Sequence, residues 1–164
     1  MNTRTIGIIT LTMTLTLASA NLSGPQIFEG RGRAESRGAG VAEFAGRIAQ
    51  RQGGQIEGSF TFNAETRNPD RNVRINLRQA NRFDVTGHVA KFTGPGRLIV
   101  RFDNTERTHD GTVIIEATDR RNPQRPGQEP DLLKVRFESR TLPGGYHFEG
   151  VVHRGDIFVG ERAR

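Results

Sequence analysis

Apolar and polar residues alternate along most of this chain with a period of two. The segment 55–64, QIEGSFTFNA, shows this best, because Phe60 and Phe62 fall on one face and every intervening position is polar. Successive side chains of a β-strand point to opposite faces of a sheet, so the pattern predicts a half-buried strand. The segment 71–79 repeats it, and the Asn-Pro-Asp run at 68–70 indicates a turn, so the two segments predict a hairpin.

Further segments toward the C-terminus alternate in the same way and predict more strands. They are 97–102, 111–119, 132–139, 145–152 and 157–161, with turns expected at 109–111, 144–145 and 154–156. The Gly-Pro-Gly sequence at 94–96 interrupts the run from 89 to 100, and it predicts a bend or bulge there.

Two segments nearer the N-terminus complete the pattern. Residues 40–51 fit an amphipathic helix as well as a strand, but Gly46 and the short length favour the strand. The Gly53-Gly54 pair would then turn the chain into the next strand. Residues 28–37 are a further strand candidate.

The fold class follows from the half-polar strands. They exclude a parallel sheet that is buried on both faces. About eight to ten such strands, joined mostly by short turns, predict an all-β antiparallel meander that forms a β-barrel or a barrel-like sandwich. A single domain over 21–164 is expected, in which the proline-rich segment 120–131 is the one long connection.

Residues 1–20 have the features of a secretory signal peptide. Arg4 is their only charge, an apolar and Thr-rich stretch follows at 6–17, and Ala18-Ser19-Ala20 supplies the small residues of a cleavage site. A transmembrane anchor and a buried strand are the alternatives, but the stretch is short for a membrane span of about 20 residues. We therefore expect cleavage before Asn21 and a secreted, periplasmic or cell-envelope protein whose mature form has no transmembrane segment.

Composition narrows the chemistry. The chain has no cysteine, which excludes disulfides, thiolate zinc sites and a cysteine nucleophile. It carries 24 Lys and Arg against 18 Asp and Glu, a formal net charge of +6 that would attract nucleic acid, anionic glycans or acidic membranes. The two signs are interspersed, which favours a mixed solvated surface. The phenylalanines alternate as core residues do, so no stacking platform for nucleic acid is expected.

A series of segments between about residues 40 and 160 resembles the secreted bacterial modules called post-COAP domains. The matching segments are GVAEFAGRI, GQIEGSFTF, VTGHVAKFTGPGRL, GTVIIEATD, PDLLKVRF and GGYHFEGVVHRGDIFV, in that order. The resemblance implies an exported all-β domain without an assigned activity, and it transfers no site residues. This chain departs from the pattern in its many arginines, its lack of tryptophan and its strand candidate at 28–37.

The histidines raise the question of a metal site. His147 and Glu149 would share one face of a strand within about 7 Å of each other, whereas His153 would lie about 20 Å from His147. Two ligands on a flat face make a weak site, since structural zinc takes four ligands and catalytic zinc three. Solvated surface histidines are therefore the favoured interpretation.

The segment around 120–131 offers three interpretations. Its carboxylates could bind calcium, an ion that prefers several hard oxygen ligands. Its arginines could instead contact an anionic envelope polymer or glycan. The third alternative is a loop paired within itself, in which Asp119 and Asp131 cap strand ends. The calcium ligands would be Asp119, Glu129 and Asp131, and the polymer contacts Arg120, Arg121 and Arg125.

No sequence motif points to catalysis, because neither a G-x-S-x-G elbow nor an H-E-x-x-H motif occurs. The expected function is therefore a structural or binding role at the cell envelope or outside the cell, without an enzyme activity. Two alternatives stay open. A lipocalin-like carrier would need an apolar cavity inside the barrel, and a barrel enzyme would need convergent polar groups with perturbed pKa values.

Overall fold

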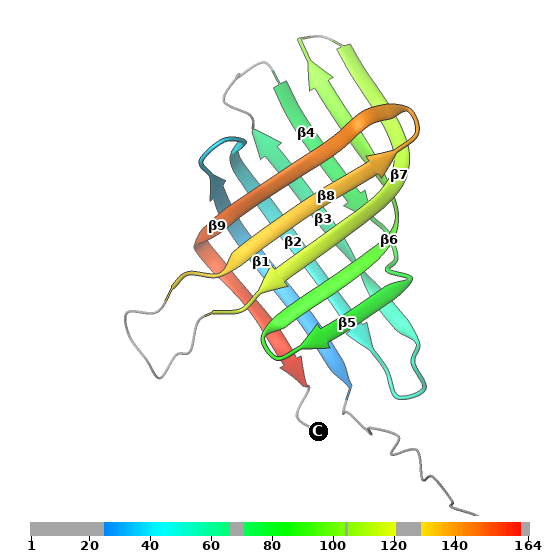
Figure 1. The fold of residues 1–164 in the computed structure, drawn as a ribbon, viewed down its shortest axis with the longest axis vertical. Helices are drawn as coiled ribbons and strands as arrows, with labels where there is room; N and C mark the ends of the chain where they lie inside the picture. Colours follow the sequence, from blue (N-terminus) through cyan, green and yellow to red (C-terminus); the bar gives the residue numbers. More distant parts are fainter. Residues whose placement is uncertain (1–24, 66–70, 104, 121–128, 162–164) are drawn as a thin grey trace, which may run out of the picture.

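The computed structural model describes residues 25–65, 71–103, 105–120 and 129–161, which form nine β-strands and no helix (Figure 1). The strands are β1 (Gln26–Ser36), β2 (Gly40–Gln50), β3 (Ile56–Glu65), β4 (Arg71–Leu77), β5 (Arg82–Thr86), β6 (Val89–Phe102), β7 (Thr105–Thr118), β8 (Leu132–Ser139) and β9 (Leu142–Glu161). The all-β prediction is confirmed, and the ambiguous segment 40–51 forms a strand. The expected signal peptide and the expected turn at 68–70 lie outside the described residues.

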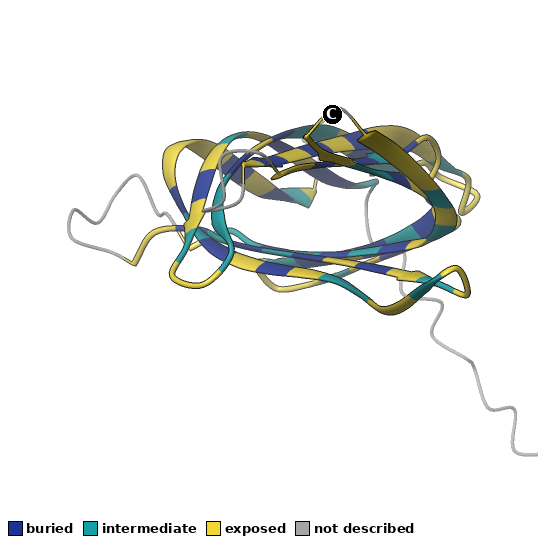
Figure 2. Ribbon diagram, turned by 90° about the horizontal axis from the view of Figure 1, so that it is seen from above, coloured by how far each residue is buried: buried dark blue, intermediate teal, exposed yellow. Residues whose placement is uncertain are grey.

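The strands pair antiparallel and close on themselves as a barrel. Their order is β4-β3-β2-β1-β9-β8-β7-β6, and a pairing of β4 with β6 joins the two ends. β5 lies outside this ring and pairs with the first part of β6. Seen from above, the ring is flattened (Figure 2). Closure leaves few unpaired strand edges, which is the physical reason that a meander of half-buried strands favours a barrel.

β6 continues through the Gly-Pro-Gly sequence at 94–96, so the expected interruption there is absent. Its pairing with β7 shows no register shift along the whole strand. What changes is the partner on the other side, which is β5 up to Thr93 and β4 from Gly96 onward. Gly94 fits this change, because a Cβ there would lie 2.4 Å from the carbonyl oxygen of Gln79. The glycine allows two backbones to approach closely.

The turns expected at 109–111, 144–145 and 154–156 are also wrong, because β7 and β9 run through them. Gly155 has a φ of 95°, and the register of β9 against β1 shifts between Arg33 and Ala34. His153 is therefore the extra residue of a β-bulge, and Gly155 lies two positions after it, paired with Gly32. Glycine with positive φ serves turns and bulges alike, so the sequence signal is the same for both.

The interior of the barrel is filled by the apolar side chains that alternate along the strands. Phe60 and Phe62 are fully buried, as their pattern predicts. The ring of Phe92 lies 4.8 Å from that of Phe28 and 5.7 Å from that of Phe60, measured between centroids. Phe62 and Phe148 meet in the same way at 5.0 Å. These rings occupy the space in which a carrier would hold an apolar ligand.

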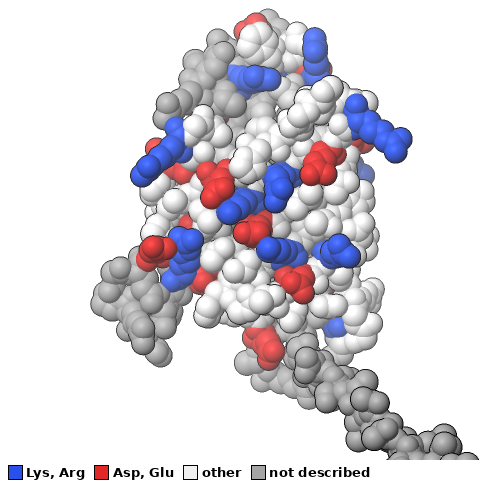
Figure 3. All heavy atoms as spheres, viewed as in Figure 1, with Lys and Arg blue, Asp and Glu red and all other residues white. Residues whose placement is uncertain are grey.

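The outward-facing positions carry charges of both signs that pair across strands. Lys91, Glu116, Lys134 and Glu149 follow one another on β6, β7, β8 and β9, with contacts of 3.1, 3.7 and 3.6 Å. Figure 3 shows positive and negative groups interspersed over this face. The described residues contain no helix of the length and hydropathy needed to cross a membrane.

Candidate functional site

The residues that flank positions 121–128 are paired with each other. Arg120 forms an ion pair of 2.6 Å with Glu129, and its backbone N–H donates to Oδ1 of Asp131 at 2.9 Å. Asp131 is fully buried, and its Oδ2 accepts the N–H of Ile157 at 2.9 Å. Among the three arginines expected to contact a polymer, Arg120 is therefore occupied, while Arg121 and Arg125 lie outside the described residues.

The three expected calcium ligands are each engaged elsewhere. Oδ2 of Asp119 accepts the N–H of Val159 at 3.3 Å, Asp131 accepts two backbone N–H groups, and Glu129 pairs with an arginine. Within the part of the chain that the structure describes, no three His, Asp or Glu side chains form a group that could hold a metal ion. The arrangement is that of carboxylates capping strand ends, as the third interpretation of this segment predicts.

Asp119 has a carboxyl pKa above its ordinary value of 3.8. Burial of the carboxyl is the largest cause, since it penalises the charged form. The neighbouring carboxylates of Asp131 and Asp156 raise this pKa further, whereas the hydrogen bond from Val159 and the nearby His88 lower it. Asp119 therefore holds the end of β9 while its negative charge is disfavoured.

We expect Asp119→Asn to stabilise the protein at neutral pH. Because the pKa of Asp119 is higher in the folded state than in the unfolded chain, its ionisation disfavours folding, and this cost develops as the pH rises above 3.8. The amide oxygen of asparagine can still accept the N–H of Val159. Urea denaturation should show the gain at pH 7, and the gain should vanish well below pH 3.8, where Asp119 is protonated in both states. A variant that is less stable at pH 7 would contradict this assignment.

The contacts of His153 and Glu149 lead away from a shared metal site with His147. Nε2 of His153 lies 3.3 Å from a carboxylate oxygen of Glu35 on β1. Glu149 pairs with Lys134 at 3.6 Å, so its carboxylate is engaged by a lysine on the neighbouring strand rather than by a metal ion shared with His147. These contacts match side chains of a mixed-charge surface rather than a metal centre.

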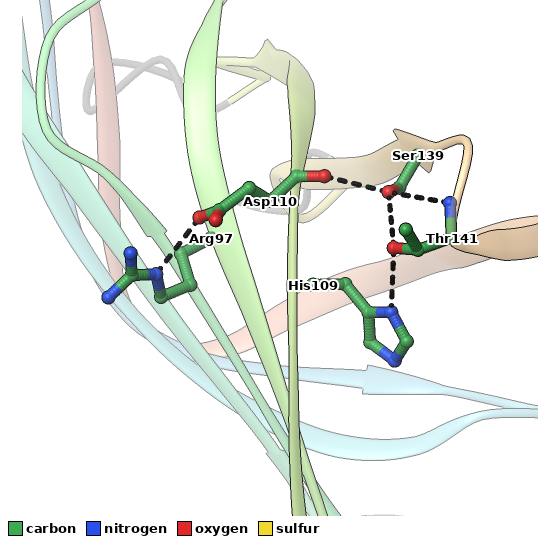
Figure 4. Close-up of polar contacts among 5 residues, drawn as sticks. All are labelled: Arg97, His109, Asp110, Ser139 and Thr141. Atoms are coloured by element: carbon green, nitrogen blue, oxygen red, sulfur yellow. Dashed lines mark hydrogen bonds and ion pairs between the residues drawn. The ribbon is translucent and has the colours of Figure 1, made fainter.

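A chain of hydrogen bonds joins β7 to the turn between β8 and β9 (Figure 4). Oγ of Ser139 donates to the backbone oxygen of Asp110 at 2.7 Å, and Oγ1 of Thr141 lies 3.0 Å from Oγ of Ser139. Nδ1 of His109 lies 3.0 Å from the same Oγ1 of Thr141. The side chain of Asp110 pairs with Nε of Arg97 at 3.0 Å, which anchors the chain to β6.

Counting protons fixes the direction of this chain. A hydroxyl has one proton to donate, and Ser139 gives its proton to a carbonyl oxygen, which only accepts. Thr141 must then donate to Ser139, and Nδ1 of His109 must donate to Thr141. Since the serine proton points to a peptide carbonyl and not to the histidine, the arrangement does not activate Ser139 as a nucleophile. We interpret this chain of hydrogen bonds, which joins β7 to the turn between β8 and β9, as a structural link and call it the His109 clasp.

Three arginines form a cluster on the outer surface of β1 and β9, two strands that lie side by side in Figure 1. This arginine cluster consists of Arg31, Arg33 and Arg154, and all three are exposed. Arg33 and Arg154 are direct cross-strand partners, and Arg31 lies two positions before Arg33 on the same face. None of the three guanidinium groups forms a hydrogen bond or ion pair with a described residue, although Glu43 stands opposite Arg33 on β2 and Asp156 stands opposite Arg31 on β9.

The arginine cluster borders a shallow hollow on the outside of the barrel. Its remaining walls include Thr61 and Asn63 of β3. Oδ1 of Asn63 accepts a hydrogen bond from Nε of Arg74 at 2.9 Å, which leaves the two amide protons of Asn63 available to a ligand. The hollow thus offers guanidinium groups, an amide and a hydroxyl to an anionic, hydroxyl-bearing molecule.

Sequence reasoning missed the arginine cluster because Arg154 falls in a segment expected to turn, and because the pairing of the first strand with the last has no local signal. The His109 clasp was missed for the same reason, since its partners lie 29 and 32 positions apart. No family model matches the chain, and neither a curated protein nor a solved structure matches it. The function is therefore inferred from the residues of the barrel itself.

Proposed function

We propose that this chain is an exported barrel module that binds an anionic polymer on its outer surface and performs no catalysis. The observation that carries the proposal is the direct opposition of Arg33 and Arg154, neither of which forms an ion pair with a described residue. Like charges directly opposite each other destabilise a sheet. A polyanion bound across the two guanidinium groups would remove this cost, and Arg31 would add a third contact on the same face.

Two further observations support surface binding over the alternatives. The rings of Phe28, Phe60 and Phe92 meet inside the barrel, which opposes a carrier with an apolar cavity. The hydroxyl chain from His109 ends on a backbone carbonyl, which opposes its use as a hydrolytic centre. The resemblance to post-COAP modules agrees with a non-enzymatic exported domain, and membership of that group stays a prediction.

Export is tested by the N-terminus of the mature protein. If residues 1–20 are a signal peptide, the intact mass of the secreted protein should correspond to a chain that begins at Asn21. Full-length precursor recovered in the membrane fraction would contradict cleavage and favour a membrane anchor.

Polymer binding is tested with dextran sulfate, using uncharged dextran as the control. We expect the protein to bind dextran sulfate and not to bind uncharged dextran. The affinity for dextran sulfate should fall as added salt screens the ionic contacts. Arg33→Gln/Arg154→Gln should weaken binding by about tenfold, because two charge-assisted contacts are lost. The same variant should be at least as stable as the wild type without polymer, since a like-charge pair is removed.

The matched control replaces the arginines of the other candidate segment, Arg120, Arg121 and Arg125, by glutamine. This triple variant should retain most of the binding, because Arg120 already pairs with Glu129. If the triple variant loses binding and the Arg33/Arg154 variant does not, the polymer contacts belong to the 120–131 segment. If dextran sulfate does not bind to the wild type at any ionic strength, the proposed function is wrong.

A further inference from the structure

One of the two large apolar side chains exposed among the described residues lies on the same face as the arginine cluster. Phe158 is 49% exposed and follows Arg154 by four positions on β9, a distance of about 13 Å along a strand. Its ring lies over Gly160, where a Cβ would be 3.0 Å from Cζ of the phenylalanine. Because residue 160 has no side chain, the phenylalanine ring has room to lie against the strand there. The ring remains half exposed to solvent.

Two adjoining hollows lie between Phe158 and the arginine cluster, and together they are called the groove. The hollow beside Phe158 and the hollow beside the arginine cluster share Arg31 and Ala45, which are cross-strand partners on β1 and β2. Small residues form the floor between the two ends, Ala45 and Gly46 on β2 and Thr61 on β3. An extended molecule could lie across this floor and reach both ends at once.

The two ends of the groove differ in charge. At the arginine end, Arg33 and Arg154 face a single carboxylate, that of Glu43, whereas Arg31 borders both hollows and stands opposite Asp156. At the Phe158 end, Glu29 and Asp156 balance Arg31 and Arg47. A polymer that carries several charges on every unit would meet repulsion from Glu29 and Asp156 beside Phe158, and more so than one with a single charge on each sugar ring. A polymer whose rings have apolar faces and separated charges would therefore meet less repulsion there.

On the basis of the proposed function, we infer that the ligand of this groove is a polyuronate, a polysaccharide whose sugar rings carry carboxylates. A carboxylate matches the planar fork of a guanidinium group and binds it through two parallel hydrogen bonds. The C–H bonds on the face of a sugar ring carry partial positive charge and pack on the negative face of an aromatic ring such as Phe158. The free amide protons of Asn63 can donate hydrogen bonds to hydroxyl oxygens of the sugar ring.

Single-stranded nucleic acid fits the groove less well. Its recognition without sequence preference relies on successive bases stacked on several aromatic side chains in a continuously basic groove. This groove has one exposed aromatic ring, and the carboxylates of Glu29 and Asp156 border that ring.

The inference is tested by the affinity of the mature protein for polygalacturonate, with dextran and a single-stranded DNA of similar length as comparisons. Phe158→Ala should weaken polygalacturonate binding about three- to tenfold, because a face-to-face contact with the sugar is lost. Phe158→Tyr should retain the affinity, since it keeps the ring. Phe102→Ala is the matched control, because Phe102 is also 49% exposed and lies at the end of β6, away from the groove.

The outcomes separate the two proposals. Loss of affinity in Phe158→Ala, with retention in Phe158→Tyr and Phe102→Ala, supports a sugar contact at Phe158. Equal affinities of Phe158→Ala and Phe102→Ala, or tighter binding of DNA than of polygalacturonate, would overturn the polyuronate assignment. In that case, dextran sulfate binding that still depends on Arg33 and Arg154 would leave the proposed function standing. Absence of binding to every anionic polymer would overturn both.

Discussion

Phe60→Ala is expected to lower the free energy of unfolding by about 3–5 kcal/mol, the usual cost of removing a buried phenylalanine ring. The ring is fully buried and packs against Phe28, Phe44 and Phe92, with centroid distances of 6.2, 6.4 and 5.7 Å. Its space is shaped by Gly46, where a Cβ would lie 2.6 Å from Cδ2 of Phe60. Because residues from three other strands, β1, β2 and β6, enclose the ring, we expect them to collapse only partly into the cavity that the alanine leaves.

The neighbouring positions on β3 provide the control for this prediction. Phe62→Ala should cost a similar amount, because Phe62 is also fully buried and touches Phe148. Thr61→Ala should cost less than about 1 kcal/mol, since Thr61 is exposed and loses only a hydrogen bond of 3.2 Å to the backbone oxygen of Ala45. Urea denaturation measures all three. Equal and small effects would contradict the register of β3.

The hairpin that begins with β3 shows what the sequence can predict. Within 55–64 and within 72–78, every second residue is apolar or small and the others are polar, so one face of each segment must be buried whatever the partner strands are. The structure has β3 and β4 within this range, paired antiparallel as expected. The same logic identified the first strand, since 28–37 was the candidate and β1 is Gln26–Ser36.

Glycine-containing segments were predicted less well because one residue type serves several backbone geometries. The segments 109–111 and 154–156 read as turns, yet each lies inside a long strand. Whether a glycine ends a strand or bulges it depends on the strand beside it, and that strand comes from a distant part of the chain. Gly155 is paired with Gly32, for example, in a close approach that neither segment reveals alone.

The closure of the barrel and the candidate site share this dependence on distant pairing. A half-polar meander predicts that edges will be closed, but not that β1 will pair with β9 and β4 with β6. The register of β1 against β9 is what places Arg33 opposite Arg154. In contrast, the capping roles of Asp119 and Asp131 were among the sequence interpretations, because both residues stand where an alternating strand meets the proline-rich segment.

Asp131→Ala is the other substitution with a large expected effect. Asp131 is the one polar residue among the described positions that is fully buried, and its two carboxylate oxygens accept the N–H groups of Arg120 and Ile157 at 2.9 Å each. Alanine would leave both donors without their partner, at an expected cost of about 2–4 kcal/mol. Asp131→Asn keeps one oxygen for two donors and turns an NH₂ group toward the other, so it should cost about 1–3 kcal/mol.

The control for Asp131 is Glu129→Gln, which breaks the neighbouring ion pair with Arg120 at an exposed position and should cost less than about 1 kcal/mol. Hydrogen exchange adds a local measurement, because the amide of Ile157 should exchange faster in Asp131→Ala while amides of β3 change only with global stability. Calcium separates a cap from a metal ligand. A ligand role requires that calcium raise the Tm of the wild type and that Asp131→Ala abolish the rise. With both oxygens of Asp131 already accepting N–H groups, we expect the Tm of the wild type to stay unchanged in millimolar calcium.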